Sequence, residues 1–543
     1  MMDSVTVTAN NEIYCPVEDA SFEGFILPEY IRQEMSTWKD SVAFESPESG
    51  VSYTYSQVME HSRAFATSLI KQGYSKGDVI GVVLPNIPEY GSIIFGIWEA
   101  GLVASPTNPM YTEEELTYQF NLCGIKAVIA NKDMLEKLHS ISCVEKIIVM
   151  GEISEGCTAS YHEMIQTDTT GMRLSMGSAI NTKTETALIL FSSGTTGLPK
   201  GVMLTHENVT VNAVQFKNQS VIASIKNFDV ESGQERTIAV LPFFHAYGFQ
   251  TVLTQSMLKG AHIVTLTKFL PALFLKALRQ HRPTFLCLVP TVINFLLSEQ
   301  VAVEDLTSLH TIILGGAAIS QETTIKFGKK CSALILLGYG LTELSPASHV
   351  CRRPKLGSIG LPLPMTWVKV IDIQSGDTVG RNVQGEICVK GPQVMKGYYN
   401  NEAATKATID EDGWLHTGDC GYYDDDNYFF IVDRIKDIIK VKGFQVSPTE
   451  MENLLKTHSK IADTAVIGIP DSSAGELPRA YVVAKEGMNI SEEELHGFIK
   501  NRVAAFKQLR GGIEFVDQIP RNPTGKILRK ELVKCYVESS NSD

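Results

Sequence analysis

Short apolar runs alternate with helix-length amphipathic segments over the first 360 residues. Residues 79–84 form a β-branched run that predicts a buried strand, and an apolar helix is predicted after Pro88 up to Gly101. The same rhythm predicts further strands at 102–105, 126–130, 187–191, 237–241, 262–266, 284–289, 311–314 and 333–337. Strands that alternate with helices form parallel sheets covered on both faces, so we predict an α/β fold whose large N-terminal domain holds two parallel-sheet subdomains.

The rhythm changes near residue 365, where shorter strands are separated by Gly and Asp turns. These strands are predicted at 369–373, 385–389 and 428–432, which indicates a small β-rich subdomain over about 360–432. After Asp433 and Arg434 the chain is strongly charged and then alternates helices and strands. We therefore expect an N-terminal domain over 1–432, a hinge at 433–437 and a small, mobile α+β C-terminal domain over 438–543.

Composition and charge narrow the classes of protein. A chain of 543 residues is too long for one hydrophobic core, and its net charge of −13 disfavours a nucleic-acid partner. Its ten cysteines are widely spaced without a CxxC pair, which favours buried free thiols in a reducing compartment. No secretory pattern, membrane-length apolar run or C-terminal Ser-Lys-Leu is present. We therefore expect a cytoplasmic protein without a membrane span, with a peroxisomal location as the alternative.

A Ser/Thr/Gly-rich loop with one lysine follows the strand predicted at 187–191. Its glycines allow close backbone approach to a phosphate, its hydroxyl and N–H groups donate hydrogen bonds, and its lysine supplies positive charge. The expected phosphate-binding residues are Ser192, Ser193, Gly194, Thr195, Thr196, Gly197 and Lys200. A Walker loop is excluded, because Gly197 stands three residues before Lys200 and Gly201 follows that lysine.

A second turn, Gly338-Tyr339-Gly340-Leu-Thr342-Glu343, follows the strand predicted at 333–337. It ends in Glu where a dinucleotide-binding GxGxxG motif has its third glycine, so a dinucleotide fold is not supported. The aromatic ring of Tyr339 suits a stacked adenine, and Thr342 is placed to reach an α-phosphate. Glu343 offers the hard oxygen that Mg²⁺ prefers. Near residue 414 a Trp-Leu-His-Thr-Gly-Asp segment presents Asp419, a carboxylate that fits the two hydroxyls of a ribose.

These motifs, in this order, resemble the adenylate-forming superfamily, which includes acyl-CoA synthetases, 4-coumarate–CoA ligases and beetle luciferases. The similarity covers about residues 50–535 and is nearest to the acid–CoA ligases. The resemblance implies ATP, Mg²⁺ and coenzyme A as cofactor and co-substrates and a small carboxylic acid as substrate. It places Ala317 along the nucleotide, Arg434 at the ribose, and Lys526, in the segment Pro523-Thr-Gly-Lys-Ile-Leu-Arg, between the carboxylate and the α-phosphate.

The resemblance also assigns residues that would bind the carboxylic acid and coenzyme A. His245, in an aromatic segment, would lie beside the incoming carboxylate, and Lys440 would act in the second step. The expected acid-binding residues are His245, Phe249, Gly316, Gly340, Ser345, Lys436 and Lys440, and those for coenzyme A are Lys268, Lys442 and Gly443. The mostly apolar wall favours an aryl-propenoic acid or a medium- or long-chain fatty acid.

Two half-reactions follow from the resemblance: formation of an acyl-adenylate with release of pyrophosphate, then transfer of the acyl group to coenzyme A. Rotation about Asp433 would present Lys526 first and the segment 440–443 second. A luciferase-type monooxygenase is the first alternative, but the arginine that beetle luciferases carry within 210–220 is missing here. An inactive binding homologue is the second, although each residue expected to do chemistry is present.

Overall fold

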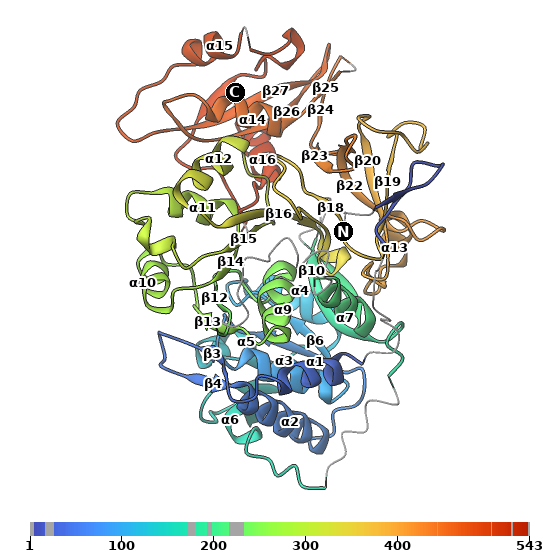
Figure 1. Ribbon diagram of the computed structural model, residues 1–543, viewed down its shortest axis with the longest axis vertical. Helices are drawn as coiled ribbons and strands as arrows, with labels where there is room; N and C mark the ends of the chain where they lie inside the picture. Colours follow the sequence, from blue (N-terminus) through green and yellow to red (C-terminus); the bar gives the residue numbers. More distant parts are fainter. Residues whose placement is uncertain are drawn as a thin grey trace.

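The computed structural model describes residues 5–16, 26–171, 180–192, 198–216, 233–442, 444–500, 502–522 and 525–540. Within this part of the chain there are five sheets, four in a large N-terminal region and one in a small C-terminal domain at one end of the molecule (Figure 1). This architecture confirms the predicted fold class, a mixed α/β protein with several parallel-containing sheets.

The first sheet has eight strands in the order β21-β11-β10-β6-β5-β7-β8-β9. Its strands run parallel from β10 to β9, whereas β11 pairs antiparallel with β10 and with β21. The strands are β5 Val79–Val83, β6 Val103–Pro106, β7 Ile125–Ala130, β8 Ile147–Val149, β9 Ala159–Ser160, β10 Thr186–Ser192, β11 Lys200–Thr205 and β21 Gly397–Tyr398. The helices of this region are α1 Leu27–Ser36, α2 Tyr55–Lys71, α3 Tyr90–Glu99, α4 Glu113–Cys123, α5 Leu135–His139, α6 Tyr161–Met164 and α7 His206–Gln215.

Two further sheets complete the parallel part of the fold, in the orders β12-β13-β3-β4 and β14-β15-β16-β17-β18. The strands β12, β13 and β3 are parallel, as are β14, β15 and β16, and antiparallel strands close one edge of each sheet. The strands are β3 Val42–Glu45, β4 Ser52–Thr54, β12 Arg236–Ala239, β13 His262–Thr265, β14 Phe285–Leu288, β15 Thr311–Leu314, β16 Leu334–Gly340, β17 Ala347–Val350 and β18 Leu361–Pro362. The helices are the π-helix Tyr247–Thr254, α9 Gln255–Leu258, α10 Pro271–His281, α11 Pro290–Leu297 and α12 Gln321–Lys330.

The β-rich subdomain is an antiparallel sheet in the order β1-β2-β19-β20-β22-β23, with α13 beside it. Its first two strands come from the N-terminal segment, where Tyr14 pairs with Trp367 and their rings stack with centroids 4.3 Å apart. The sequence pattern did not predict this pairing. The elements are β1 Thr6–Val7, β2 Ile13–Tyr14, β19 Trp367–Ile371, β20 Gly385–Lys390, β22 Leu415–Tyr423, β23 Phe429–Arg434 and α13 Glu402–Thr408.

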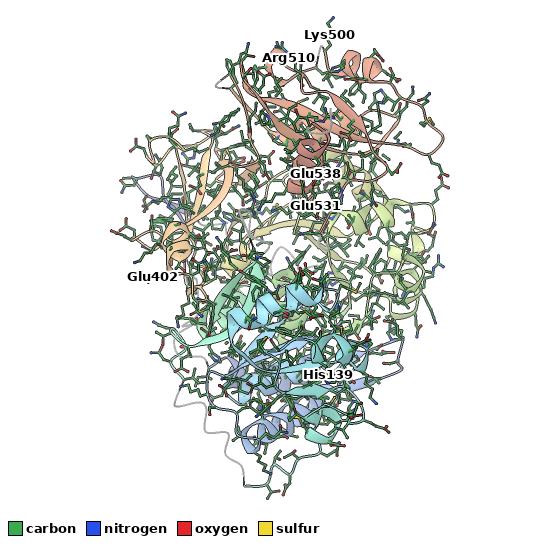
Figure 2. The ribbon with its side chains drawn as sticks, turned by 180° about the vertical axis from the view of Figure 1, so that it is seen from behind. His139, Glu402, Lys500, Arg510, Glu531 and Glu538 are labelled. Carbon is green, nitrogen blue, oxygen red and sulfur yellow. The ribbon has the colours of Figure 1, made fainter. Side chains whose placement is uncertain are left out.

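The C-terminal domain has its own sheet and an apolar core separate from that of the large region. Its elements are β24 Ile439–Val441, β25 Phe444–Val446, β26 Ile461–Asp471, β27 Gly475–Ala484, β28 Ile513–Phe515, α14 Pro448–Lys456, α15 Glu492–Lys500 and α16 Arg529–Ser540. Seen from behind, Lys500 and Arg510 mark the outer edge of this domain, and Glu531 and Glu538 lie on the side toward the large region (Figure 2). The link between β23 and β24 spans 435–438 and overlaps the hinge that the sequence predicts at 433–437.

From its composition, the chain is expected to have buried free thiols and to lack a membrane span. All ten cysteines are free thiols, and seven of them are buried. No helix among the described residues has both the length and the apolar character that a membrane crossing needs.

Candidate active site

A cavity of about 700 Å³ lies where the ends of β10 and β16, the β-rich sheet and the C-terminal domain meet. Thirteen of the residues predicted from sequence line it, although they are spread over more than 330 positions of the chain. They are Ser192, Lys200, His245, Gly316, Gly338, Tyr339, Gly340, Thr342, Glu343, Arg434, Lys436, Lys440 and Lys526. The structure thus brings most of the predicted nucleotide-binding and catalytic residues into one space.

The predicted phosphate loop lies between two paired strands. Ser192, the last residue of β10, pairs with Lys200, the first residue of β11, so the loop that joins them is held at its base. Residues 193–197, which include the predicted Ser193, Gly194, Thr195, Thr196 and Gly197, lie outside the described residues. The ammonium group of Lys200 lies 4.6 Å from the ring centroid of Tyr398. This cation–π contact fixes the position of the lysine at the cavity wall.

Glu343 is connected to the same tyrosine. It lies in the 3₁₀ turn Thr342–Leu344, directly after the close backbone approach at Gly340, where a Cβ atom would lie 1.8 Å from the carbonyl oxygen of Pro346. The hydroxyl of Tyr398 donates to Glu343 Oε1 over 2.8 Å. Tyr398 therefore joins the predicted phosphate-binding lysine and the predicted magnesium-binding carboxylate. The carboxylate lines the cavity and offers hard oxygen, which fits Mg²⁺.

A buried group of three polar side chains forms the next part of the site. The hydroxyl of Tyr339 donates to Asp419 Oδ2 over 2.6 Å, and Arg434 Nε lies 2.6 Å from Asp419 Oδ1. Asp419 and Arg434 are direct partners across β22 and β23, so the sheet register fixes their pairing. Burial raises the pKa of Asp419, and the Arg434 guanidinium opposes this rise. Asp419 is not among the residues that line the cavity, whereas its partners Tyr339 and Arg434 do line it.

Lys526 enters the cavity from the C-terminal domain. Its loop is closed by two hydrogen bonds between Asn522 and Lys526, one from each backbone N–H, over 2.9 Å. Burial lowers the pKa of Lys526, with Arg434 as the next cause. Burial likewise lowers the pKa of Lys436 to about 8. With Lys200 and Lys440, these groups give the cavity five cationic side chains, a field suited to a polyphosphate.

His245 lies in the opposite wall, just before the π-helix Tyr247–Thr254. Its Nδ1 accepts a hydrogen bond from the backbone N–H of Tyr247 over 3.3 Å. Burial lowers the pKa of His245 to about 4, and the positive charge of Lys526 contributes to this shift. The imidazole is therefore neutral near pH 7, and it faces a lysine that comes from the other domain.

Other predicted residues lie away from the cavity lining. Phe249 is fully buried and packs edge-to-face on Trp98, and Ser345 is buried with its hydroxyl donating to Gln393 O over 2.9 Å. Lys268 and Lys442 are exposed, and Ala317 is half-buried outside the lining. Gly443 falls outside the described residues.

Several lining residues escaped the sequence analysis. Tyr398 is one, and Tyr247, whose hydroxyl donates to Ile313 O over 2.9 Å, is another. Thr107 and Asn108 follow β6, at the same edge as β10, and line the cavity as well. The signal for this pair was available, because polar residues directly after a parallel strand lie at the ligand-binding edge of a sheet. Tyr398, in a short edge strand, carried no comparable signal.

The fold and this cavity together define a nucleotide-dependent enzyme of the adenylate-forming type, with a site shared by a large and a small domain. The chain belongs to the AMP-binding enzyme family: the model of that family matches residues 31–399, and the model of the AMP-binding enzyme C-terminal domain matches residues 450–526. The predicted superfamily and the predicted class, an AMP-forming ligase, are confirmed.

Individual relatives extend over nearly the whole chain. A protein from Dictyostelium discoideum named probable 4-coumarate–CoA ligase 1 is 38% identical, covering 93% of this chain and 94% of that protein. A luciferin 4-monooxygenase from Nipponoluciola cruciata is 36% identical over 97% of this chain and 96% of its own. The crystal structure of ATP-bound MatB from Rhodopseudomonas palustris superposes with a TM-score of 0.83 at 26% identity, covering 94% of this chain and 99% of that one.

Proposed function

We propose that the protein joins a carboxylic acid to coenzyme A at the expense of ATP, in two steps that use one cavity. In the first step a carboxylate oxygen bonds to the α-phosphorus as the bond to the bridging oxygen breaks, and pyrophosphate leaves with the electron pair. In the second step the thiolate of coenzyme A attacks the acyl carbonyl carbon, and AMP leaves. The observation that carries the proposal is Lys526, which reaches from the C-terminal domain into a cavity already lined by Lys200 and Glu343.

Charge explains why these side chains are needed in the first step. A carboxylate and a triphosphate are both anions, so their approach is slow until positive charge lies between them. Lys526 and Arg434 are proposed to supply that charge at the α-phosphate and ribose, and Lys200 at the outer phosphates. Mg²⁺, held through Glu343, would neutralise phosphate oxygens during the transfer. The low pKa of His245 keeps its ring neutral, so it adds no charge that competes with Lys526.

The second step is proposed to use the other face of the C-terminal domain. Lys440 lies in β24, which pairs with β25 in a hairpin, and Lys442 directly follows β24. The hairpin stands next to the linker 435–438, so a rotation there would exchange the loop of Lys526 for the hairpin. Domain closures of this kind commonly gate turnover in enzymes.

The cavity lining narrows the class of acid. Beside His245 the wall is formed by aromatic and aliphatic side chains, namely Phe216, Phe244, Tyr247, Ile313, Ala347 and Val350. Such a surface favours an aryl or medium-chain acyl group over a short hydrophilic acid, because burial of apolar surface supplies the binding free energy. The name of the relative from Dictyostelium discoideum points in the same direction.

A pyrophosphate-release assay tests the substrate proposal. The acids to compare are aryl-propenoic, medium-chain and long-chain fatty acids, each with and without coenzyme A. We expect ATP-dependent release with aryl or medium-chain acids and acyl-CoA formation only when the thiol is present. Release without any acyl-CoA product would contradict the proposal.

Separate assays of the two steps test the assigned role of Lys526. Replacing Lys526→Ala should abolish adenylate formation, because the charge between the two anions is lost, and should leave thiolation of a supplied acyl-adenylate largely intact. Lys534→Ala is the matched control, since it removes an exposed lysine from α16 of the same domain. An equal loss of both steps in Lys526→Ala would refute the division of labour.

The luciferin 4-monooxygenase relative supports a second candidate function. An enzyme of that kind forms an adenylate in the same way and then reacts it with oxygen, so the first step alone does not distinguish the two. Light emission with luciferin, ATP and Mg²⁺ in air is the discriminating measurement. We expect no emission above that of the Lys526→Ala variant.

A further inference from the structure

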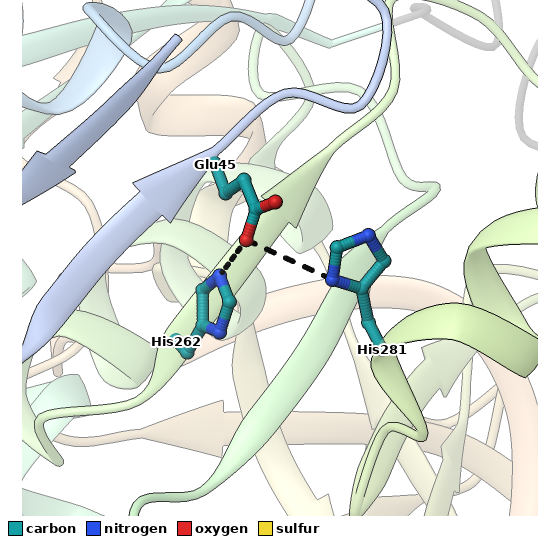
Figure 3. Close-up of side chains that lie close together, drawn as sticks. All are labelled: Glu45, His262 and His281. Atoms are coloured by element: carbon teal, nitrogen blue, oxygen red, sulfur yellow. Dashed lines mark ion pairs between the residues drawn. The ribbon is translucent and has the colours of Figure 1, made fainter. Parts of the chain in front are cut away.

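Three metal-ligating side chains gather away from the cavity, at the four-stranded sheet (Figure 3). Glu45 ends β3, His262 begins β13 and His281 ends α10. Glu45 Oε2 lies 3.0 Å from His262 Nε2 and 3.7 Å from His281 Nδ1, so both rings face the same carboxylate oxygen. The three ligand atoms all lie within 4.8 Å of one another.

These distances match those expected around a bound metal ion. Tetrahedral ligands that lie about 2.0–2.2 Å from Zn²⁺ are separated from each other by roughly 3.4 Å. The two observed separations, 3.0 and 3.7 Å, lie on either side of that value. The third separation, between the two histidine nitrogens, is at most 4.8 Å, so the three atoms can surround one ion if the side chains adjust.

The contact of His262 with Glu45 is not an ordinary hydrogen bond. Its Nε2 is buried and has no hydrogen-bond partner within the described residues, although the carboxylate oxygen is 3.0 Å away. In a metal site the lone pairs of the ligands converge on a point between them, and not on each other. A buried nitrogen without a partner is unfavourable, and a bond to a metal would satisfy it.

Regular elements hold all three ligands. β3 and β13 are parallel neighbours in which Val264 pairs with Glu45, so the sheet register brings His262 to the carboxylate. The third ligand comes from the end of α10, which Arg282 closes in the left-handed conformation. Ligands on strands and helix ends are held more firmly than ligands on loops. The histidine rings stand almost perpendicular, with centroids 6.0 Å apart.

Burial and exposure also suit a bound ion. The side chains of His262 and His281 are 13% and 7% exposed, whereas Glu45 is 32% exposed and leaves a route from solvent. Two histidines and one carboxylate form a set of nitrogen and oxygen ligands typical of Zn²⁺, with a water molecule in the fourth position.

We propose that Glu45, His262 and His281 form a zinc site that cross-links β3, β13 and the end of α10. The site stands apart from the cavity that holds Lys526, so the proposal does not depend on the acid or on the reaction. A second cluster, Glu386, Cys388 and His416, is less suitable. Glu386 already accepts a hydrogen bond from Gly418 N over 2.9 Å and lies, with His416, in the cavity wall.

Zinc titration of the full chain after chelator treatment tests the proposal, with calorimetry as the readout. The variants are Glu45→Gln, His262→Gln and His281→Gln. His139→Gln is the matched control, an exposed histidine on the back of the large region (Figure 2). We expect the wild type and His139→Gln to bind one zinc ion that each ligand variant binds at least about 100-fold more weakly, since the loss of a mere second-shell partner already costs ~10–100-fold. The cluster at Glu386 is present in every sample, so any zinc that it binds is the same for the wild type and for each variant.

Two further measurements test metal binding independently of calorimetry. Zinc should raise the melting temperature of the wild type and of His139→Gln but not of the ligand variants, because an ion that binds only the folded state stabilises it. Cobalt in place of zinc should give the visible absorption of a four-coordinate ion, and that absorption should be missing in the variants. Circular dichroism shows which of the three ligand variants remain folded. One folded ligand variant is enough for the test. If a folded ligand variant binds zinc with the stoichiometry and affinity of His139→Gln, the proposal is wrong.

Discussion

Asp419 illustrates how single residues set up the site. Its carboxylate is 4% exposed, and each oxygen already has a partner, the hydroxyl of Tyr339 on one side and the guanidinium of Arg434 on the other. Burial of a charge is unfavourable unless it is paired, and here the pairing is double. A carboxylate has about four lone-pair sites, so the two that remain on Asp419 can still accept the ribose hydroxyls predicted from the sequence.

Tyr398 is the residue that we expect to couple Lys200, proposed to bind phosphate, to Glu343, proposed to bind Mg²⁺. Replacing Tyr398→Phe removes the hydrogen bond to Glu343 but keeps the ring beneath Lys200. A hydrogen bond to a charged group contributes about 1.5–3 kcal/mol, so Glu343 should be less well oriented for Mg²⁺. We expect the Mg²⁺ concentration for half-maximal pyrophosphate release to rise about tenfold or more, as measured by titration at saturating ATP.

Tyr399→Phe provides the control for that measurement, because the neighbouring tyrosine is not among the residues that line the cavity. It should leave the Mg²⁺ requirement unchanged. If Tyr398→Phe lowers the rate without changing the Mg²⁺ requirement, Tyr398 does not act through Glu343.

His349 gives a prediction for pH. Its ring is fully buried between Tyr339 and Phe429, and burial lowers its pKa to about 3. In the unfolded chain a histidine has a pKa of about 6.5, so between pH 3 and 6.5 the unfolded state binds more protons. The free energy of unfolding must therefore rise with pH through that window and level off above it. This residue contributes up to about 1.4 kcal/mol per pH unit to the rise. Urea unfolding of the large region between pH 4.5 and 7.5 measures this dependence.

The variant His349→Gln should lose that share of the pH dependence. Some dependence should remain, since burial also lowers the pKa of His245 and His206 to about 4. His139→Gln, at an exposed position, should behave like the wild type. An unchanged slope in a folded His349→Gln variant would contradict the assignment.

At the scale of elements, local signals and long-range pairings differ in how well the sequence predicts them. β5 and β15 were predicted because a parallel strand buried on both faces is a continuous run of apolar residues. The strands β1 and β2 were not predicted. Tyr14 pairs with Trp367 across most of the chain, and no local pattern in either segment indicates that pairing. The same limit applies inside the site. The residues proposed to bind the nucleotide were predicted from motifs, whereas the pairing of Tyr398 with Glu343 depends on an edge strand whose register no local pattern fixes.

Helix α4 carries a local signal that can be tested directly. The hydroxyl of Thr112 accepts from the backbone N–H of Glu115, and the Glu115 carboxylate accepts from the N–H of Thr112, which forms a capping box. Replacing Thr112→Ala should destabilise the first turn by about 1 kcal/mol. Amide hydrogen exchange at 113–115 should accelerate about fivefold as a result. Thr117→Ala, inside the same helix, should show no such acceleration, because alanine favours the helix interior.

At the scale of the whole molecule, the site depends on how two separately packed domains meet. The large region and the C-terminal domain have distinct apolar cores, and polar contacts join the two domains near the linker. Asp433, at the end of β23, makes two of them: its Oδ2 accepts from Ser447 Oγ over 2.6 Å and from Thr449 N over 2.9 Å. Ser447 caps α14, so one carboxylate of the β-rich sheet holds the first turn of a helix in the other domain.

Weakening that contact should therefore affect catalysis through domain position. Asp433→Asn removes the charge and one accepting oxygen, and a loss of about 1–2 kcal/mol lowers the population of the docked state by roughly 5–30-fold. We expect adenylate formation to fall within that range, thiolation of a supplied acyl-adenylate to fall less, and protease cleavage at 435–438 to accelerate. Asp425→Asn, at an exposed turn of the same sheet, is the control and should match the wild type. If Asp433→Asn reduces both steps equally while the linker stays as resistant as in the control, Asp433 acts on the nucleotide and not on the placement of the domain that carries Lys526.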